Sequence, residues 1–133
     1  MKEWKLLSTV TLDEPKNVAF ELKNINCTEI YIFGNSGITE SGNTSIDVSN
    51  VGMFVGISTI GSCKYNTIHL FVVGGRLLMD EVGDYALQGY TYNKVGIHPK
   101  TSYVGDLITN IKLFRNLGTN TFVKGSTFEI WGR

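Results

Sequence analysis

The chain lacks net charge, long apolar runs and any leader-like segment, and each absence excludes a class of function. Its 12 basic residues balance 12 acidic ones, which gives no electrostatic footprint for nucleic acid or an anionic membrane surface. No apolar run approaches the roughly 20 residues that cross a bilayer, and no charged segment followed by an apolar one opens the chain. The sequence therefore predicts no nucleic-acid partner, no membrane insertion and no signal peptide.

Cysteine and proline are also scarce, with two residues of each type among 133. Cys27 and Cys63 form no CxxC motif, so they are either one bridge or two small buried thiols, and we expect the thiols. A chain of this length buries roughly two thirds of its unfolded surface without a disulfide or a metal. The sequence predicts neither cofactor nor metal.

What the chain does have is strand periodicity. Hydrophobic residues make up 42% and charged residues 18%, a composition that excludes disorder. Apolar and polar residues alternate in many short runs, and helical periodicity is almost absent. The clearest hairpin is NTIHLFVVGGRLLMDEV, whose two apolar runs meet at Gly74-Gly75. The sequence predicts one domain over residues 1–133: an all-β, antiparallel, jelly-roll-like sandwich of about eight to nine short strands.

Two runs predict which faces of their strands are buried. In TEIYIFG, two isoleucines alternate with Tyr31 and Phe33, so both faces are apolar, which is typical of a central strand. In WKLLSTVTL, one face of a single strand is expected to hold Trp4, Leu6, Val10 and Leu12. Because Trp4 and Trp131 stand at opposite ends of the chain, we expect at least one of them to be packed.

Residues suited to catalysis are few. His69 lies within an apolar strand and His98 precedes a proline, and both are interpreted as structural or surface residues. No Ser/His/Asp order and no nucleophile elbow is present. The acidic residues of MDEVGD lack the regular spacing of a calcium loop and are interpreted as an exposed turn. The sequence predicts that the protein is not an enzyme.

The C-terminal run ITNIKLF…TFVKGSTFEIWGR resembles the ending of many structural proteins of tailed-phage and prophage virions. The opening runs WKLLSTVTL and VAFELKNINCTEIYIFG are similar to the start of the same domains, whereas the stretch from about residue 35 to 109 has no such likeness. The matching positions at the C-terminus are Ile108, Ile111, Leu113, Phe122, Gly125, Ser126, Phe128, Ile130, Trp131 and Gly132.

This resemblance implies a virion component made in a bacterial host cytoplasm, such as a tail-fibre or baseplate domain. Such domains are often trimeric, assemble with other virion proteins, and in some cases bind host-surface polysaccharide. The chain itself carries no fibre stalk. A bacterial carbohydrate-binding module or lectin unrelated to a virion is the alternative, and a glycan depolymerase fragment ranks below both.

The expected ligand site is the tyrosine-rich segment DYALQGYTYNKVGIHPKTSYVGD. Aromatic rings stack on the apolar faces of sugars, and side-chain amides pair with sugar hydroxyls. A subunit interface would use the same residue types, and the polar loop from Gly34 to Ser45 is the alternative binding tip. The predicted ligand-binding residues are Tyr85, Gln88, Tyr90, Tyr92, Asn93 and Tyr103.

Overall fold

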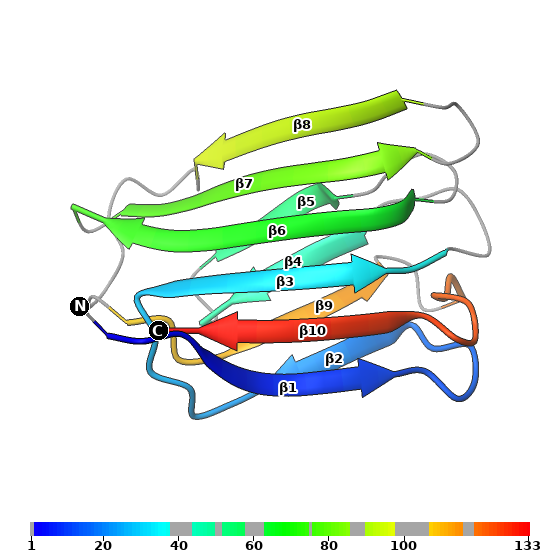
Figure 1. The fold of residues 1–133 in the computed structure, drawn as a ribbon, viewed down its shortest axis with the longest axis horizontal. Helices are drawn as coiled ribbons and strands as arrows, with labels where there is room; N and C mark the ends of the chain where they lie inside the picture. The colour runs from blue at the N-terminus through cyan, green and yellow to red at the C-terminus, as the bar shows by residue number, and fades with distance from the viewer. Residues whose placement is uncertain are drawn as a thin grey trace.

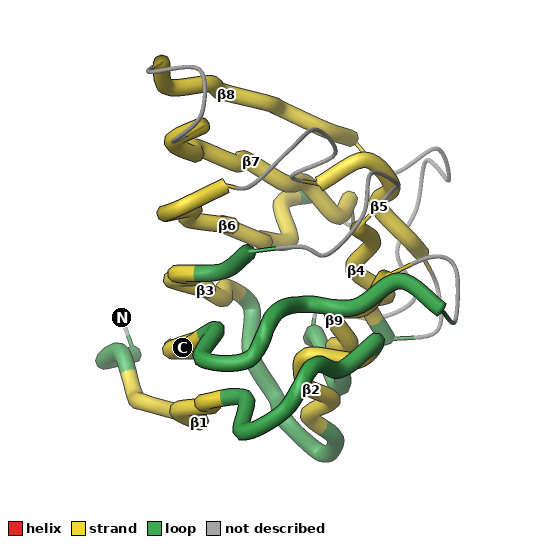
Figure 2. The backbone as a smooth tube through the Cα atoms, turned by 90° about the vertical axis from the view of Figure 1, so that its right-hand side faces the viewer, coloured by secondary structure: helices red, strands yellow, loops and turns green. Residues whose placement is uncertain are grey.

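The computed structural model describes residues 2–37, 44–49, 52–57, 63–74, 76–85, 90–97, 107–115 and 119–133. This part of the chain forms ten β-strands and no helix, and the strands lie in two antiparallel sheets that face one another (Figures 1 and 2). The all-β sandwich is therefore confirmed. The strands are β1 (Lys5–Thr11), β2 (Val18–Leu22), β3 (Glu29–Asn35), β4 (Thr44–Val48), β5 (Gly52–Ile57), β6 (Cys63–Val73), β7 (Arg76–Tyr85), β8 (Tyr90–Ile97), β9 (Ile111–Arg115) and β10 (Thr127–Gly132).

The strand order is that of a jelly roll with one added hairpin. The larger sheet has the order β1-β10-β3-β6-β7-β8 and the smaller sheet the order β2-β9-β4-β5. Without β7 and β8, each sheet interleaves early and late strands, as two Greek keys do in a jelly roll. The β7–β8 hairpin widens the larger sheet beyond the smaller one (Figure 2). The described structure has ten strands where the sequence predicts eight to nine. The additional strand is β8, whose sequence, YTYNKVGI, shows no clear apolar period.

The core lies between the sheets, and in strands such as β3, β9 and β10 alternate side chains are buried in it. Burying these side chains supplies the main stabilising term, roughly 25 cal/mol for each Å² of apolar surface removed from water. The aromatic rings of Phe20 and Phe122 pack edge-on against Phe128. The fully buried apolar side chains include Ile30, Ile32, Ile46, Val48, Ile68, Leu70, Ile108, Ile111 and Ile130.

Strand β1 contains a bulge that the sequence did not predict. Leu6 pairs with Trp131 and Ser8 with Ile130, which leaves Leu7 as the extra residue. A bulge inserts one residue and so reverses the alternation of faces. Leu7 packs against the core, whereas Leu6 is 50% exposed. The prediction that one face carries the four apolar residues of WKLLSTVTL is therefore wrong.

Strand β3 lies between β10 and β6, as expected for a central strand. Ile30 and Ile32 are fully buried, but Phe33 on the opposite face is 44% exposed. The smaller sheet covers one face of β3, and no other layer of the described structure covers the second face (Figure 2). The prediction of a central strand is confirmed, and its second apolar face, which carries Phe33, is partly exposed.

The β6–β7 hairpin is confirmed, with Gly74 in the left-handed region at φ +58°. The acidic run that follows does not form the exposed turn that we predicted. Asp80 and Glu81 lie within β7, and Glu81 is fully buried at 0% exposure. The Asn66 Nδ2 group lies 3.5 Å from Glu81 Oε2. The strand continues past the apolar run because its pairing with β6 extends to Tyr85.

Candidate functional site: an aromatic platform on the larger sheet

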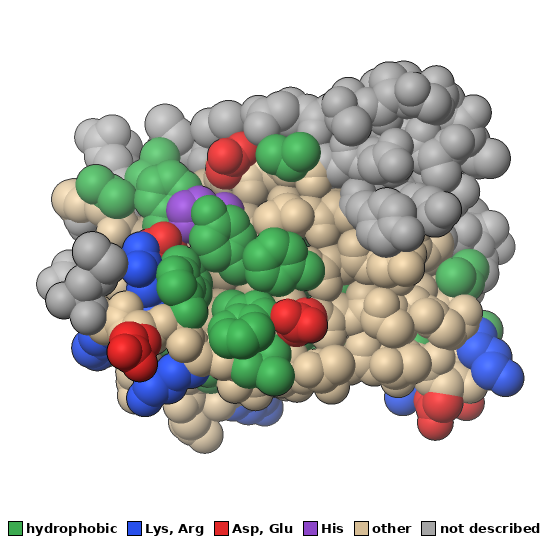
Figure 3. Space-filling model, in the orientation of Figure 1, with side chains coloured by type: hydrophobic (Ala, Val, Ile, Leu, Met, Phe, Trp, Pro, Cys, Tyr) green, Lys and Arg blue, Asp and Glu red, His purple; other side chains and the backbone are tan. Residues whose placement is uncertain are grey.

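The outer face of the larger sheet gathers aromatic side chains from both ends of the chain. Both chain ends lie at the same end of the sandwich (Figure 1). Backbone pairing aligns Leu6, Trp131, Tyr31 and His69 in one row across β1, β10, β3 and β6. Figure 3 shows hydrophobic side chains gathered over these strands, with charged side chains and a histidine at their margin. No layer of the described residues covers this cluster, so within that part of the chain it is a surface and not a core.

The rings in this cluster pack against one another in a continuous series. Tyr31 lies at its centre, with ring centroids 5.2 Å from Trp4, 5.7 Å from Phe33 and 4.2 Å from His69. His69 in turn stacks on Phe71 at 4.5 Å. Aromatic pairs at such distances stabilise by about 0.5–1.5 kcal/mol each beyond the area that they bury. The series therefore holds its rings in fixed orientations.

Four of the aromatic residues enclose a shallow depression of about 220 Å³, lined by Trp4, Tyr31, Phe33 and Trp131. We call these four residues the aromatic platform. Its volume is below the roughly 300–1,000 Å³ of pockets that enclose a small molecule. A ligand in this depression would therefore stay partly in solvent. Both tryptophans of the chain belong to it.

Charged side chains border the platform and are tied to it. The Arg133 guanidinium lies 4.5 Å from the centre of the Trp4 ring and donates two hydrogen bonds, at 3.1 and 3.3 Å, to Glu29 Oε1. The other oxygen of Glu29 lies 3.0 Å from His69 Nε2. Arg133, Glu29, His69, Tyr31 and Trp4 thus form a closed ring of contacts. The indole of Trp131 donates a hydrogen bond to the Glu129 carboxylate on the same face.

This arrangement combines apolar ring faces with hydrogen-bonding groups at their edge. Aromatic faces attract the C–H face of a ring-shaped ligand, and Tyr and Trp each add a polar group. Carboxylates accept hydrogen bonds from hydroxyl groups, and a guanidinium donates them. The described residues contain no group of three or more His, Cys, Asp and Glu side chains that could hold a metal ion. The site is suited to binding a polyhydroxylated ring.

A deeper cleft adjoins the platform where the chain ends meet the segment between β2 and β3. It has a volume of about 560 Å³ and shares Arg133 with the border of the platform. We call it the basic cleft. Burial raises the pKa of the Cys27 thiol in its lining, and the charges of Lys2 and Lys5 act in the opposite direction. The cleft is lined by Lys2, Glu3, Lys5, Leu7, Asn24, Ile25, Asn26, Cys27, Gly132 and Arg133.

The Cys27 thiol predicts a loss of stability in alkali. Cys27 is a buried free thiol, as expected from the sequence. The pKa of the thiol is raised in the folded state. The protonated thiol therefore contributes fully to the stability of the fold below the ordinary pKa of about 9, and this contribution is lost as the pH rises through the pKa of the folded state. We expect the free energy of unfolding to fall more steeply above pH 9 in the wild type than in Cys27→Ala. If urea unfolding at a series of pH values shows the same dependence of the unfolding free energy on pH in both proteins, this prediction is contradicted.

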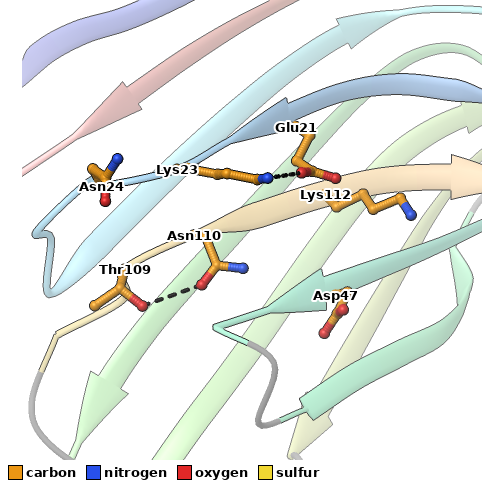
Figure 4. Close-up of a pocket in the computed structure, with 7 residues that line it drawn as sticks. All are labelled: Glu21, Lys23, Asn24, Asp47, Thr109, Asn110 and Lys112. Atoms are coloured by element: carbon orange, nitrogen blue, oxygen red, sulfur yellow. Dashed lines mark hydrogen bonds and ion pairs between the residues drawn. The ribbon is translucent and has the colours of Figure 1, made fainter.

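A third hollow, the polar groove, lies on the outer face of the smaller sheet. Its volume is about 460 Å³, and Lys112 of β9 stands between its register partners Glu21 and Asp47 (Figure 4). Lys23 pairs with Glu21 at 3.0 Å, so acids and bases balance along the groove. None of the described residues that line it is aromatic. The lining residues are Glu21, Lys23, Asn24, Asp47, Thr109, Asn110 and Lys112.

The predicted tyrosine-rich site falls at the far edge of the larger sheet. Tyr85 ends β7 and pairs with Tyr90 of β8, and Tyr92 pairs with Gly83. Asn93 is the partner of Val82, which is 46% exposed. Gln88 and Tyr103 lie outside the described residues, as does half of the alternative loop, positions 38–43. The backbone thus brings four of the six predicted residues to β7 and β8, the second and third strands beyond β3.

Sequence reasoning missed the platform itself. The sequence predicts only that at least one of Trp4 and Trp131 is packed, whereas the pairing of β1 with β10 brings both to one depression. The signal was the alternation in TEIYIFG, where Tyr31 and Phe33 form a second apolar face. An exposed aromatic face and a doubly buried strand give the same sequence pattern. Only the sheet order separates the two readings.

Comparison with protein-family models, curated proteins and solved structures finds no match to this chain. The resemblance to virion proteins therefore depends on the sequence motif alone. Most of its positions are core residues of the sandwich, including Ile108, Ile111, Phe128 and Ile130, which are at most 2% exposed. These side chains fill the core, so their presence in the motif indicates the fold. Trp131 is the motif position that contributes to the platform.

Proposed function

We propose that the protein is a non-enzymatic glycan-binding domain that acts through the aromatic platform. The observation that carries this proposal is the set of four ring-bearing residues around one shallow depression on an uncovered sheet face. The bordering carboxylates and guanidinium supply the polar contacts that a hydroxylated ring requires. Jelly-roll sandwiches also occur among lectins and viral capsid proteins.

The setting that we propose is a tail appendage of a phage or prophage virion, in which the domain binds host-surface polysaccharide. The motif shared with virion proteins supports this setting, and a trimer that assembles with other virion proteins is expected. A lectin-like module unrelated to a virion is the alternative. Light scattering behind a sizing column discriminates between them, because the alternative predicts a monomer of 14.7 kDa.

Ligand-induced stabilisation tests the binding proposal directly. A ligand that binds only the folded state raises its stability by RT ln(1 + [L]/Kd), about 2.7 kcal/mol at a hundredfold excess over Kd. We expect at least one capsular or O-antigen polysaccharide, from a panel of bacterial strains, to raise the melting temperature in proportion to the logarithm of its concentration. Unchanged melting with every polysaccharide in the panel would contradict glycan binding.

A further inference from the structure

We propose that the basic cleft binds the anionic group of an acidic glycan, whose sugar ring lies on the aromatic platform. This inference rests on the proposed function and names its ligand class. The shared chemistry is a carboxylate or a phosphate attached to a sugar, and Lys2 and Lys5 are its main partners.

The lining of the cleft favours an anion. Among the described side chains that line it, three are cationic, those of Lys2, Lys5 and Arg133, and one is a carboxylate, that of Glu3. Lys2 and Lys5 are exposed and take part in no ion pair with any other residue that the structure describes. Arg133 is already bonded to Glu29, so the two lysines carry the charge that a ligand would neutralise.

The shape of the cleft fits a small anionic group. Its volume of about 560 Å³ falls within the range of sites that enclose small ligands. Leu7, Ile25 and Cys27 give it an apolar part, and Asn24 and Asn26 contribute side-chain amides. Hydrogen bonds to a charged group are stronger when surrounding groups exclude water. The cleft is therefore expected to bind an anion more tightly than two lysines on an open surface would.

The cleft and the platform adjoin one another at the contact between Arg133 and Trp4. Arg133 lines the cleft, and its guanidinium lies 4.5 Å from the ring of Trp4, which lines the platform. A sugar stacked on the platform therefore directs a substituent past Arg133 toward the lysines. The polar groove shares Asn24 with the cleft, but its charges are balanced, so it has no comparable excess of positive charge to attract an anion.

The test is an NMR titration of the wild-type protein with sodium glucuronate, glucose 1-phosphate and glucose at low ionic strength. The backbone amides of Asn26, Cys27 and Gly132 report on the cleft, and the indole N–H of Trp131 reports on the platform. We expect at least one of the two charged sugars to bind about tenfold more tightly than glucose and to shift the cleft amides. Whichever charged sugar does so identifies the anion as carboxylate or phosphate. Added salt is expected to remove the difference.

Matched variants separate this site from general electrostatics. The Lys2→Gln/Lys5→Gln variant is expected to lose the tenfold preference, whereas Lys16→Gln/Lys124→Gln, with the same change in charge outside the cleft lining, is expected to keep it. Unshifted cleft amides with both charged sugars, or equal binding by the first variant and the wild type, would overturn the inference. A shift of the Trp131 indole by glucose alone would leave the proposed function standing. Cleft shifts without an indole shift would contradict both the platform and the placement of the sugar ring on it.

Discussion

Replacing Trp131 with alanine is expected to weaken polysaccharide binding about 30-fold. Trp131 lines the depression, and its indole is oriented by the hydrogen bond to Glu129. Central aromatic residues of a binding site typically contribute about 2 kcal/mol or more when truncated, and about 1.4 kcal/mol corresponds to a tenfold change. Isothermal titration of the variant with the polysaccharide that stabilises the wild type measures the loss.

Two control variants show whether the loss belongs to the platform. Trp131→Phe keeps an aromatic face and is expected to retain most of the affinity. Phe114→Ala removes a half-buried ring from β9 of the opposite sheet, where Lys112 lies 5.0 Å from its centre, and is expected to bind as the wild type does. If Phe114→Ala loses affinity and Trp131→Ala keeps it, the site lies on the smaller sheet.

Gly34→Ala is expected to destabilise the fold by about 2–3 kcal/mol, as overpacking of a core does, and to lower the melting temperature by about 10 °C. A Cβ at this position would lie 2.4 Å from Asn66 Oδ1 and 3.3 Å from the ring of Phe128. Asn66 is 8% exposed and lies beside the buried Glu81, so it cannot move without disturbing another buried polar group. Urea unfolding of the variant measures the cost.

A double-mutant cycle assigns this cost to the contact with Asn66. Gly34→Ala is expected to cost less in an Asn66→Ser background, where the clashing oxygen is absent. Gly74→Ala is the comparison, because its φ of +58° carries strain but no atom lies within 4 Å of the added Cβ, and about 1–2 kcal/mol is expected there. Equal costs of Gly34→Ala in both backgrounds would exclude the clash as the cause.

The sequence predicts the architecture well because alternation is a local signal. A subset of the apolar positions in TEIYIFG, TIHLFVV and ITNIKLF alternates with a period of two, and the structure buries these side chains between the two sheets: Ile30, Ile32, Ile68, Leu70, Ile111 and Leu113. The Gly74-Gly75 turn is equally local, since it requires only a residue that accepts a positive φ. These elements depend on neighbours within a few residues.

The remaining features depend on contacts between distant segments. The bulge at Leu7 arises from the register between β1 and β10, which no run within β1 reveals. Glu81 follows an apolar run and reads as part of a turn, but pairing with Ile68 keeps it in the sheet. The platform joins residues 4, 31, 33 and 131. Sequence reasoning found aromatic chemistry but placed it in the segment where tyrosines are close in sequence.

The most direct test of the platform is the emission of its two tryptophans during titration with a polysaccharide that stabilises the protein. Because both tryptophans of the chain line the depression, binding there must change their fluorescence. We predict a saturable change whose midpoint equals the Kd from calorimetry. Binding detected by calorimetry without any change in tryptophan emission would contradict the platform and direct attention to Tyr85–Tyr103.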